Sequence, residues 1–291
     1  MTDLWLGMAL MILLGGAAFA GGLWVAKKFS TRVTTLMILL TVVTLLLYAR
    51  FVYGRPMIAR WLPFSNVIMV GNALPVLAGF LAGLAWGRIH GRAWRKCVTV
   101  VPLAALGIYS LARPLVGEPP ACATKWKDGV CLQTSPATCS AAAAVTLLRH
   151  YGIESTEQEM AVLSLTREKG TLPLGLFRGL KRKTAGTAWD VEMVIGDIST
   201  SLSASLDALR ATAVEPVIIT VGLRQDAQVD RRYEEVWNWT RGVEHTVVLF
   251  RFLPDDKVEM GDPSFGRERW DVQGIRDLWH RDGIRLVKRK E

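Results

Sequence analysis

Four residues in the second half of the chain have the types and the spacing of a thiol-based acyl-transfer site. Gln133 lies six positions before Cys139, and Asp262 lies 17 positions after His245. A thiol requires a base, here His245, that forms the thiolate and later protonates the leaving amine. The base needs an acceptor such as Asp262 to fix its tautomer. The side-chain amide of Gln133 and the backbone N–H of Cys139 would bind the oxyanion.

The sequence around Cys139 predicts that its thiol lies in the first turn of a helix. Start signals at Ser135, Pro136 and Thr138 precede it, the run SAAAAVTLLRHY favours a helix, and Gly152 follows as a stop. The aligned backbone dipoles and free N–H groups of a first turn stabilise a thiolate and lower the pKa of a cysteine. Cys139 is therefore the candidate nucleophile, although a buried structural thiol or a disulfide partner stays an alternative.

Further helices and strands must position the other three side chains. A capping box, Thr156 with Glu159, opens a second helix, and residues 173–183 and 201–211 also predict helices. Helices followed by strands indicate an α+β domain in which the N-terminal helices pack on an antiparallel sheet. Adjacent antiparallel strands joined by a short turn would bring the histidine and the aspartate together. Four apolar runs predict the strands: residues 215–223, 244–253, 256–262 and 283–289.

The first 116 residues have a different composition. They are dense in Leu, Val, Ala, Met and Ile, and acidic residues are nearly absent after Asp3, which raises the whole chain to 51% hydrophobic residues. The segment GGAAFAGG favours close helix contact. We expect a four-helix transmembrane domain over residues 1–116 and a second domain over residues 117–291. Four stretches are long enough to span a bilayer: residues 4–26, 33–53, 65–87 and 97–116.

Basic residues in the links between these stretches predict the orientation. Links one and three together carry seven Lys and Arg residues, the second link with its flank carries three, and the N-terminus carries none. We therefore expect an integral protein of a bacterial inner membrane with both termini outside and the second domain extracytoplasmic. The opposite orientation, with that domain in the cytosol, is the alternative. The same pattern explains the net charge of +9 without nucleic acid as a partner.

Two further cysteines precede the candidate nucleophile. Cys122 and Cys131 enclose eight residues with polar and glycine content that can turn back on itself. An oxidising exterior favours a disulfide between them, which would leave Cys139 unpaired; two free thiols in a reduced compartment are the alternative. No Cys-x2-Cys or His-x3-His spacing occurs, so we expect neither zinc nor any other cofactor.

The motifs of residues 129–290, in this order, resemble papain-like cysteine peptidases. More narrowly, they resemble the bacteriocin-processing peptidases that cut after double-glycine leaders. The resemblance is carried by Gln-x5-Cys, EQEMAVLS, His-x-Val-Val-Leu, Asp-Pro-x-x-Gly and the tail LWHRDGIRLV. It implies a papain-like α+β fold. It also implies that Gln133 binds the oxyanion, Cys139 attacks, His245 exchanges protons and Asp262 orients the histidine.

One departure from that family lies at the nucleophile. The family commonly has Asp-Cys-Gly where this chain has Thr138-Cys139-Ser140. The changed neighbours would alter how a substrate backbone fits beside the thiol. A second departure is the arrangement of domains, because the peptidase-like segment here follows four apolar stretches. No Gly-x4-Gly-Lys-Ser/Thr loop occurs in the chain, so ATP-driven export would require a separate exporter.

The sequence thus predicts a membrane-anchored cysteine peptidase that cleaves a peptide or pro-protein through an acyl-enzyme on Cys139. The resemblance adds a small-residue or Gly-Gly leader as the site of the cut. The lipid bilayer and a separate exporter or membrane complex are the expected partners. Two alternatives stay open: a thiol acyltransferase of transglutaminase-like or amidase type, and a catalytically silent module that binds a peptide or assembles a complex. Labelling of the thiol separates the last from the other two.

Overall fold

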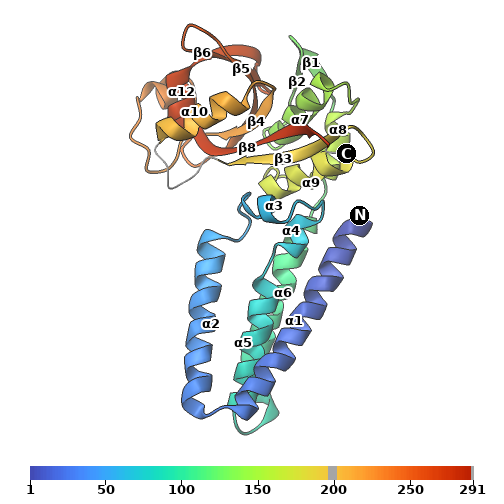
Figure 1. Cartoon of the computed structure of the whole chain (residues 1–291), viewed down its shortest axis with the longest axis vertical. Coiled ribbons are helices and arrows are strands. Elements are labelled where there is room, and N and C mark those ends of the chain that lie inside the picture. Colours follow the sequence, from blue (N-terminus) through green and yellow to red (C-terminus); the bar gives the residue numbers. More distant parts are fainter. Residues whose placement is uncertain (196–201, 290–291) are drawn as a thin grey trace. The chain divides into compact units, whose positions relative to one another are not determined.

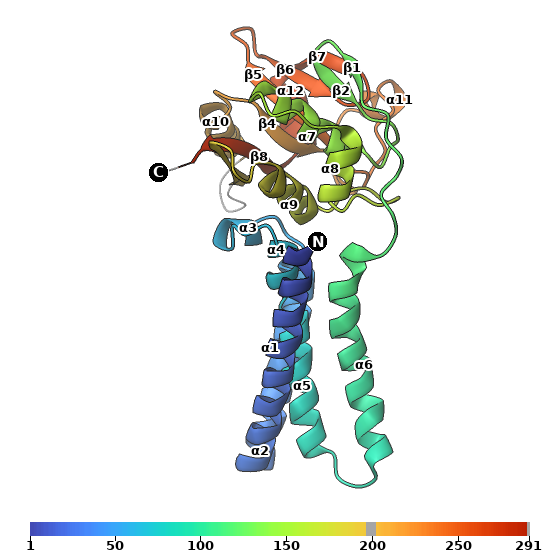
Figure 2. The same cartoon turned by 90° about the vertical axis from the view of Figure 1, so that its right-hand side faces the viewer.

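The computed structural model describes residues 1–195 and 202–289. The chain divides into two compact units, Met1–Val116 and Gly117–Glu291 (Figures 1 and 2). The first unit is helical, and the second combines helices with an antiparallel sheet. The sheet confirms the predicted antiparallel arrangement of the second half of the chain.

Long apolar helices make up the first unit. Four helical segments in the described part of the chain are long and apolar enough to cross a membrane: Thr2–Lys28, Thr31–Phe51, Val67–Arg88 and Ala93–Leu115. They confirm the four predicted apolar helices, whereas their insertion in a bilayer and its orientation stay predictions. The elements are α1 (Thr2–Lys28), α2 (Thr31–Phe51), α3 (Ile58–Trp61), α4 (Val67–Val70), α5 (Leu74–Arg88) and α6 (Ala93–Ala112), followed by a 3-10 turn at Arg113–Leu115.

Glycines let α1 and α5 pack with their backbones in contact. A Cβ atom at Gly83 would collide with the carbonyl oxygen of Phe19, and one at Gly22 would collide with that of Phe80. In an apolar solvent, close van der Waals packing of small residues is a main source of helix association. The close helix contact expected from GGAAFAGG is therefore confirmed between these two helices.

The third apolar segment is broken rather than continuous, unlike the single stretch that the sequence predicted. The break lies between α4 and α5, at Gly71, Asn72 and Ala73. Tyr48 donates its hydroxyl to the Gly71 carbonyl (2.7 Å) and accepts the Ala73 N–H (2.9 Å). The Asn72 amide donates to the Ser110 hydroxyl at 3.0 Å. Neighbouring helices thus satisfy the backbone groups that the break leaves free, as an apolar environment demands.

Six strands form one sheet in the second unit, in the order β3-β8-β4-β5-β6-β7. Every neighbouring pair is antiparallel. Two of these strands, β3 and β7, were not predicted, because polar and charged residues interrupt their apolar pattern. The strands are β3 (Trp189–Ile195), β4 (Val217–Val221), β5 (His245–Phe252), β6 (Lys257–Asp262), β7 (Gly266–Asp271) and β8 (Trp279–Lys288).

Helices cover both faces of this sheet. Helix α7 (Cys139–His150) is buried from Cys139 to Leu148 and packs on β5 and on α8 (Glu157–Leu163), which contacts α9 (Pro173–Lys183). The small alanine side chains of α7 allow it to pack closely on these neighbours. The sheet's other face packs on α10 (Leu202–Thr212) and α12 (Val272–Leu278) through a core that includes Leu209 and Ile275. The expected helix 201–211 corresponds to α10, except that residue 201 lies outside the described residues. A short hairpin, β1 (Lys125–Lys127) with β2 (Val130–Leu132), precedes α7, and α11 (Arg232–Glu235) precedes β5.

Candidate active site

The chain enters α7 through a tight turn that places Cys139 at the first helical residue. The Thr138 hydroxyl accepts the Ser135 N–H (3.1 Å) and donates to the Ser135 carbonyl (2.9 Å). Thr138 is therefore used in the turn before the helix and does not cap the helix with its side chain. The predicted helix start is confirmed, and the thiol of Cys139 is 7% exposed there.

His245 and Asp262 meet across the two strands that the sequence expected to bring them together. The Nε2 atom of His245 lies 2.8 Å from Oδ1 of Asp262. Asp262 is 3% exposed, and the same oxygen accepts the backbone N–H of Ser264 at 2.7 Å. The carboxylate is thus held from two sides. With Nε2 engaged by Asp262, Nδ1 is the ring nitrogen that remains for the thiol.

The Cys139 thiol and the His245 imidazole interact closely enough that each shifts the titration of the other. Burial raises the pKa of the Cys139 thiol, but the hydrogen bond and charge of His245, the Thr246 N–H and the Ser140 hydroxyl outweigh it, so the pKa lies below its ordinary value. Burial lowers the pKa of His245, whereas Asp262 and Cys139 raise it, to about 10 overall. These opposite shifts favour a thiolate paired with an imidazolium, which is the reactive form of such a pair.

A tryptophan from the loop before β5 borders the imidazole. The rings of Trp239 and His245 lie 6.2 Å apart between centroids, at 67°. Trp239 also meets Trp270 edge-on, with centroids 6.0 Å apart. The segment RRYEEVWNWTRG therefore contributes an aromatic contact to the candidate base.

Gln133 lies beside the turn that carries the acceptor. Its backbone N–H donates to the Pro263 carbonyl at 2.8 Å, next to Asp262. Its side-chain Oε1 is buried without a hydrogen-bond partner among the described residues. The backbone contact fixes where the residue sits, and the donation of its amide to an oxyanion stays a prediction.

Glu157 braces the segment between Gln133 and α7, and the sequence did not single it out. It is fully buried, and its carboxylate accepts the Thr134 N–H (2.7 Å) and the Thr134 hydroxyl (2.5 Å). Its own N–H donates to the Thr124 hydroxyl at 2.9 Å. The visible signal was the capping box around it, in which Thr156 accepts the Glu159 N–H at 3.1 Å. That motif explains the helix start but not the buried acid.

The predicted disulfide between Cys122 and Cys131 is wrong for this structure, in which all four cysteines are described and carry free thiols. The hairpin register is the reason, because β1 and β2 place Trp126 opposite Cys131. The Cys122 thiol instead donates to the Pro120 carbonyl at 3.3 Å. Burial, followed by the charge of Glu157, raises the pKa of Cys122 to about 11 and that of Cys131 to about 12. Neither thiol resembles Cys139 in its chemistry.

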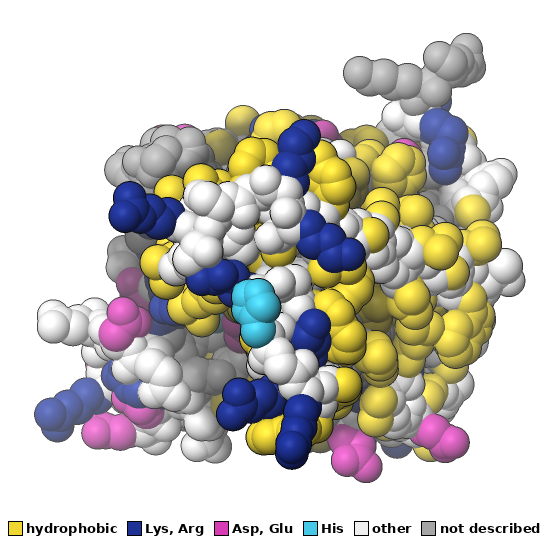
Figure 3. Space-filling view, turned by 90° about the horizontal axis from the view of Figure 1, so that it is seen from below, with side chains coloured by type: hydrophobic (Ala, Val, Ile, Leu, Met, Phe, Trp, Pro, Cys, Tyr) yellow, Lys and Arg dark blue, Asp and Glu magenta, His cyan; other side chains and the backbone are white. Residues whose placement is uncertain are grey.

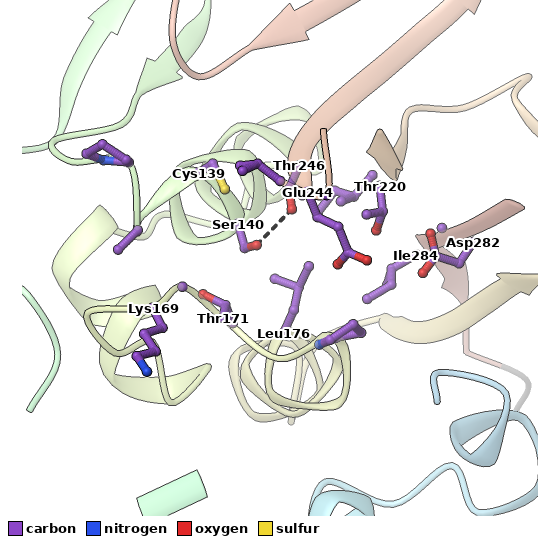
Figure 4. A pocket seen from close by; sticks show the side chains of 18 of the residues that line it. Cys139, Ser140, Lys169, Thr171, Leu176, Thr220, Glu244, Thr246, Asp282 and Ile284 are labelled. Carbon is purple, nitrogen blue, oxygen red and sulfur yellow. Dashed lines mark hydrogen bonds between the residues drawn. The ribbon is translucent and has the colours of Figure 1, made fainter. Parts of the chain in front are cut away.

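A cavity of about 480 Å³ opens beside the candidate nucleophile. Cys139, Ser140 and Thr246 form one end of its lining, and the hydroxyl oxygens of Ser140 and Thr246 lie 2.8 Å apart there (Figure 4). Two acids that the sequence did not single out, Glu244 and Asp282, also line it. A group bound in this cavity would lie next to Cys139.

His150, at the end of α7, is remote from this arrangement. It ends the helix that Cys139 begins, and its Nε2 lies 3.1 Å from Glu215 Oε2 on an exposed surface. The helix therefore separates it from the thiol by its whole length, about 16 Å at helical rise. His245 is the histidine that the fold brings to Cys139.

Solved structures that are similar to this chain include the following three. The peptidase domain of Streptococcus ComA, a bi-functional ABC transporter involved in a quorum sensing pathway, is 18% identical, with 54% of this chain and 96% of that chain covered and a TM-score of 0.41. A double glycine motif protease from an AMS/PCAT transporter, solved with its leader peptide, is 14% identical, with 57% and 94% covered and a TM-score of 0.41. The peptidase domain of Streptococcus mutans ComA is 17% identical, with 55% and 98% covered and a TM-score of 0.36. No family model and no curated protein matches the chain.

Proposed function

We propose that the second unit is a cysteine peptidase in which Cys139 is the nucleophile, His245 the acid–base residue and Asp262 its orienting partner. The observation that carries this is the place of the His245 ring, which lowers the pKa of the Cys139 thiol and has its Nε2 atom 2.8 Å from the Asp262 carboxylate. The lowered pKa of the thiol and the raised pKa of the imidazole support the same assignment. The adjoining cavity supplies room for a substrate group.

The chemistry follows from these positions. The thiolate of Cys139 attacks the peptide carbonyl carbon, and the C–O π electrons move to the oxygen. The backbone N–H of Cys139 at the start of α7 and the Gln133 amide donate to that oxyanion. The imidazolium of His245 protonates the leaving amine as the C–N bond breaks, which leaves a thioester on Cys139. Water, deprotonated by His245, then hydrolyses the thioester and restores the pair.

The first unit is proposed to anchor this peptidase in a lipid bilayer. Four apolar helices support the anchoring. The basic residues of the α1–α2 and α5–α6 links support a cytoplasmic location for the end of the helical unit that carries both links. Figure 3 shows Lys and Arg side chains gathered around a histidine in the view from below. The second unit would then be extracytoplasmic, where it would act on a peptide or pro-protein delivered by a separate exporter. A periplasmic reporter fused after residue 291 tests this, since an inactive fusion contradicts the orientation.

Two measurements test the peptidase itself. The full chain is prepared in detergent with Cys97→Ser, which removes the exposed thiol, and is labelled with iodoacetamide at pH 7. Labelling that disappears with Cys139→Ala, but persists in the matched control Cys122→Ala, supports the nucleophile. Equal labelling with and without Cys139 contradicts it.

Measurements of peptide hydrolysis distinguish the peptidase from the two alternative functions, an acyltransferase and a silent binding module. Peptides with small residues before the cut, as the sequence resemblance implies, and peptides with larger residues are both offered, and His245→Ala should abolish cleavage. Transfer of the acyl group to an added amine in preference to water would indicate an acyltransferase. A protein that binds peptides but is neither labelled at Cys139 nor able to hydrolyse them would indicate a silent module.

A further inference from the structure

The strand β8 is irregular where it passes β4. After the pair formed by Ile219 and Gly283 the register shifts, and the next pair lies four residues away on β8 but two away on β4. Within the longer strand Arg281 has φ +65°, a left-handed conformation that costs about 1 kcal/mol or more for a residue with a Cβ atom. Bulges of this kind re-aim side chains and are frequent beside active sites. The side chain that this one displaces is Asp282.

The bulge brings the Asp282 carboxylate to the wall of the cavity beside Cys139, where Figure 4 shows it close to Thr220. The Thr220 side chain lowers the pKa of the carboxyl, and Oδ1 is buried with no hydrogen-bond partner among the described residues. Burial is the main reason that the pKa of this carboxyl is raised. A buried carboxylate is costly to charge, and a cation bound in the cavity that Asp282 lines would stabilise its charged form.

A second carboxylate points into the same space. Glu244 directly precedes His245, and Figure 4 shows its carboxylate directed into the cavity on the side where Asp282 and Ile284 lie. Its Oε1 lies 3.4 Å from Nδ1 of His280, and its side chain is 61% exposed. A cation in the cavity would thus meet a buried acid at one end and a solvent-facing acid nearer the mouth.

The remaining lining suits a long side chain with a charged end. Leu176, Ile218 and Ile284 provide apolar wall between the thiol and the acids. Lysine and arginine combine an apolar stem with a cationic head, so their stems pack on such a wall while the head reaches an acid. Lys169 also lines the cavity, but Figure 4 places it at the edge away from Asp282, and Glu168, which precedes it in the sequence, is also a lining residue.

We infer that this cavity takes the side chain of a lysine or an arginine of the peptide substrate, at a position next to the bond that Cys139 attacks. The head would pair with Asp282, and Glu244 would add a weaker attraction near the mouth. This inference describes the substrate of the proposed peptidase, so it rests on that proposed function. It differs from cleavage after two glycines, because a glycine has no side chain to fill a cavity of about 480 Å³.

The test is a set of fluorogenic peptides that carry lysine, norleucine, glutamate or glycine at one position, moved stepwise along both sides of the cut. At one position kcat/KM for lysine should exceed that for norleucine at least about tenfold, because a hydrogen bond to a charged group is strong where water is excluded. Asp282→Asn should reduce this ratio about tenfold. The matched control is Glu192→Gln, which removes an acid paired with Arg285 outside the cavity and should keep the preference.

A second readout does not depend on turnover. Peptidyl chloromethyl ketones with lysine or norleucine alkylate Cys139, and the lysine reagent should react faster in the parent chain but not in Asp282→Asn. Iodoacetamide labelling of Cys139 at the parent rate shows that the variant is folded. Equal rates for both reagents, or a preference that Asp282→Asn leaves intact, overturn the specificity while the peptidase assignment survives. Absence of any reaction at Cys139 in the parent chain overturns both.

Discussion

The hydroxyl oxygens of Ser140 and Thr246 lie 2.8 Å apart in a buried contact. Ser140 follows Cys139 on α7 and Thr246 follows His245 on β5, so the contact ties helix to strand one residue away from each member of the candidate pair. The Ser140 hydroxyl and the Thr246 N–H also lower the pKa of the Cys139 thiol, against burial, which raises it. A serine where the resembling family commonly has glycine thus acts on the nucleophile itself.

Ser140→Ala is therefore expected to weaken both stability and reactivity. Loss of one buried hydrogen bond should lower the free energy of unfolding by about 1 kcal/mol. The pKa of the thiol should rise, which slows alkylation of Cys139 at pH 7. Thr246→Val removes the same side-chain contact but keeps the backbone N–H, so it should slow alkylation less. A double variant whose loss of stability equals the sum of the two single losses would show that the hydroxyls are not coupled.

The pH dependence of alkylation measures the ionisation of the Cys139–His245 pair. Because the pKa of Cys139 lies below its ordinary value, the thiolate should be present at lower pH than in a free cysteine. As the pH rises through about 10, His245 loses the proton that it would give to the leaving amine, so peptide hydrolysis should fall there. The onset of alkylation at low pH and the fall of hydrolysis at high pH both reflect the titration of the coupled pair and not of either residue alone. Rates measured from pH 5 to pH 11 test both.

His245→Gln removes the imidazolium and leaves the burial that raises the pKa of the thiol. Alkylation of Cys139 at pH 7 should then fall at least about tenfold and recover only at alkaline pH. Cys122 and Cys131, with pKa values raised to about 11 and about 12, should stay unlabelled at pH 7 in both proteins. An unchanged rate in His245→Gln would mean that the histidine does not activate the thiol.

Local patterns predicted the parts of the site that depend on local structure. Turn residues and an alanine-rich run predicted the start of α7 at Cys139, and two apolar strands predicted the meeting of His245 and Asp262. The acid Asp282 was missed because its position depends on a bulge between β8 and β4, two strands far apart in the sequence. Pairing register of this kind leaves no periodic signal in either strand alone.

Similar reasons explain why β7 was not predicted and why the disulfide prediction was wrong. In β7 the exposed positions alternate with less exposed ones and carry charged residues, such as Arg267 and Arg269, so no apolar run marks the strand. The disulfide prediction failed because eight intervening residues allow a bridge only if the hairpin brings both cysteines face to face, and this register puts Trp126 opposite Cys131. Cysteine spacing alone cannot specify the register.

Glu157 should be needed for the approach to the nucleophile rather than for the chemistry. Glu157→Ala leaves the buried Thr134 N–H without its acceptor, and such a loss costs about 1–3 kcal/mol. We expect a lower melting temperature and a lower rate of hydrolysis, with the pH profile of Cys139 alkylation unchanged. Glu159→Ala is the matched control, since that residue is in the same helix turn and its carboxylate pairs with Lys183. A shifted pH profile in Glu157→Ala would assign the acid to the titrating site.

The backbone contact between α1 and α5 predicts a strong dependence of the first unit on single glycines. Gly83→Ala would place a methyl group against the Phe19 carbonyl, so the two helices must separate and lose packing along their length. Gly16→Ala is the matched control on α1, because a Cβ atom there meets nothing within 4 Å, and alanine favours a helix over glycine. In detergent, Gly83→Ala should lower the thermal stability of the full chain or its yield, and Gly16→Ala should leave both unchanged or higher. If both variants behave like the parent chain, α1 and α5 do not pack through these glycines.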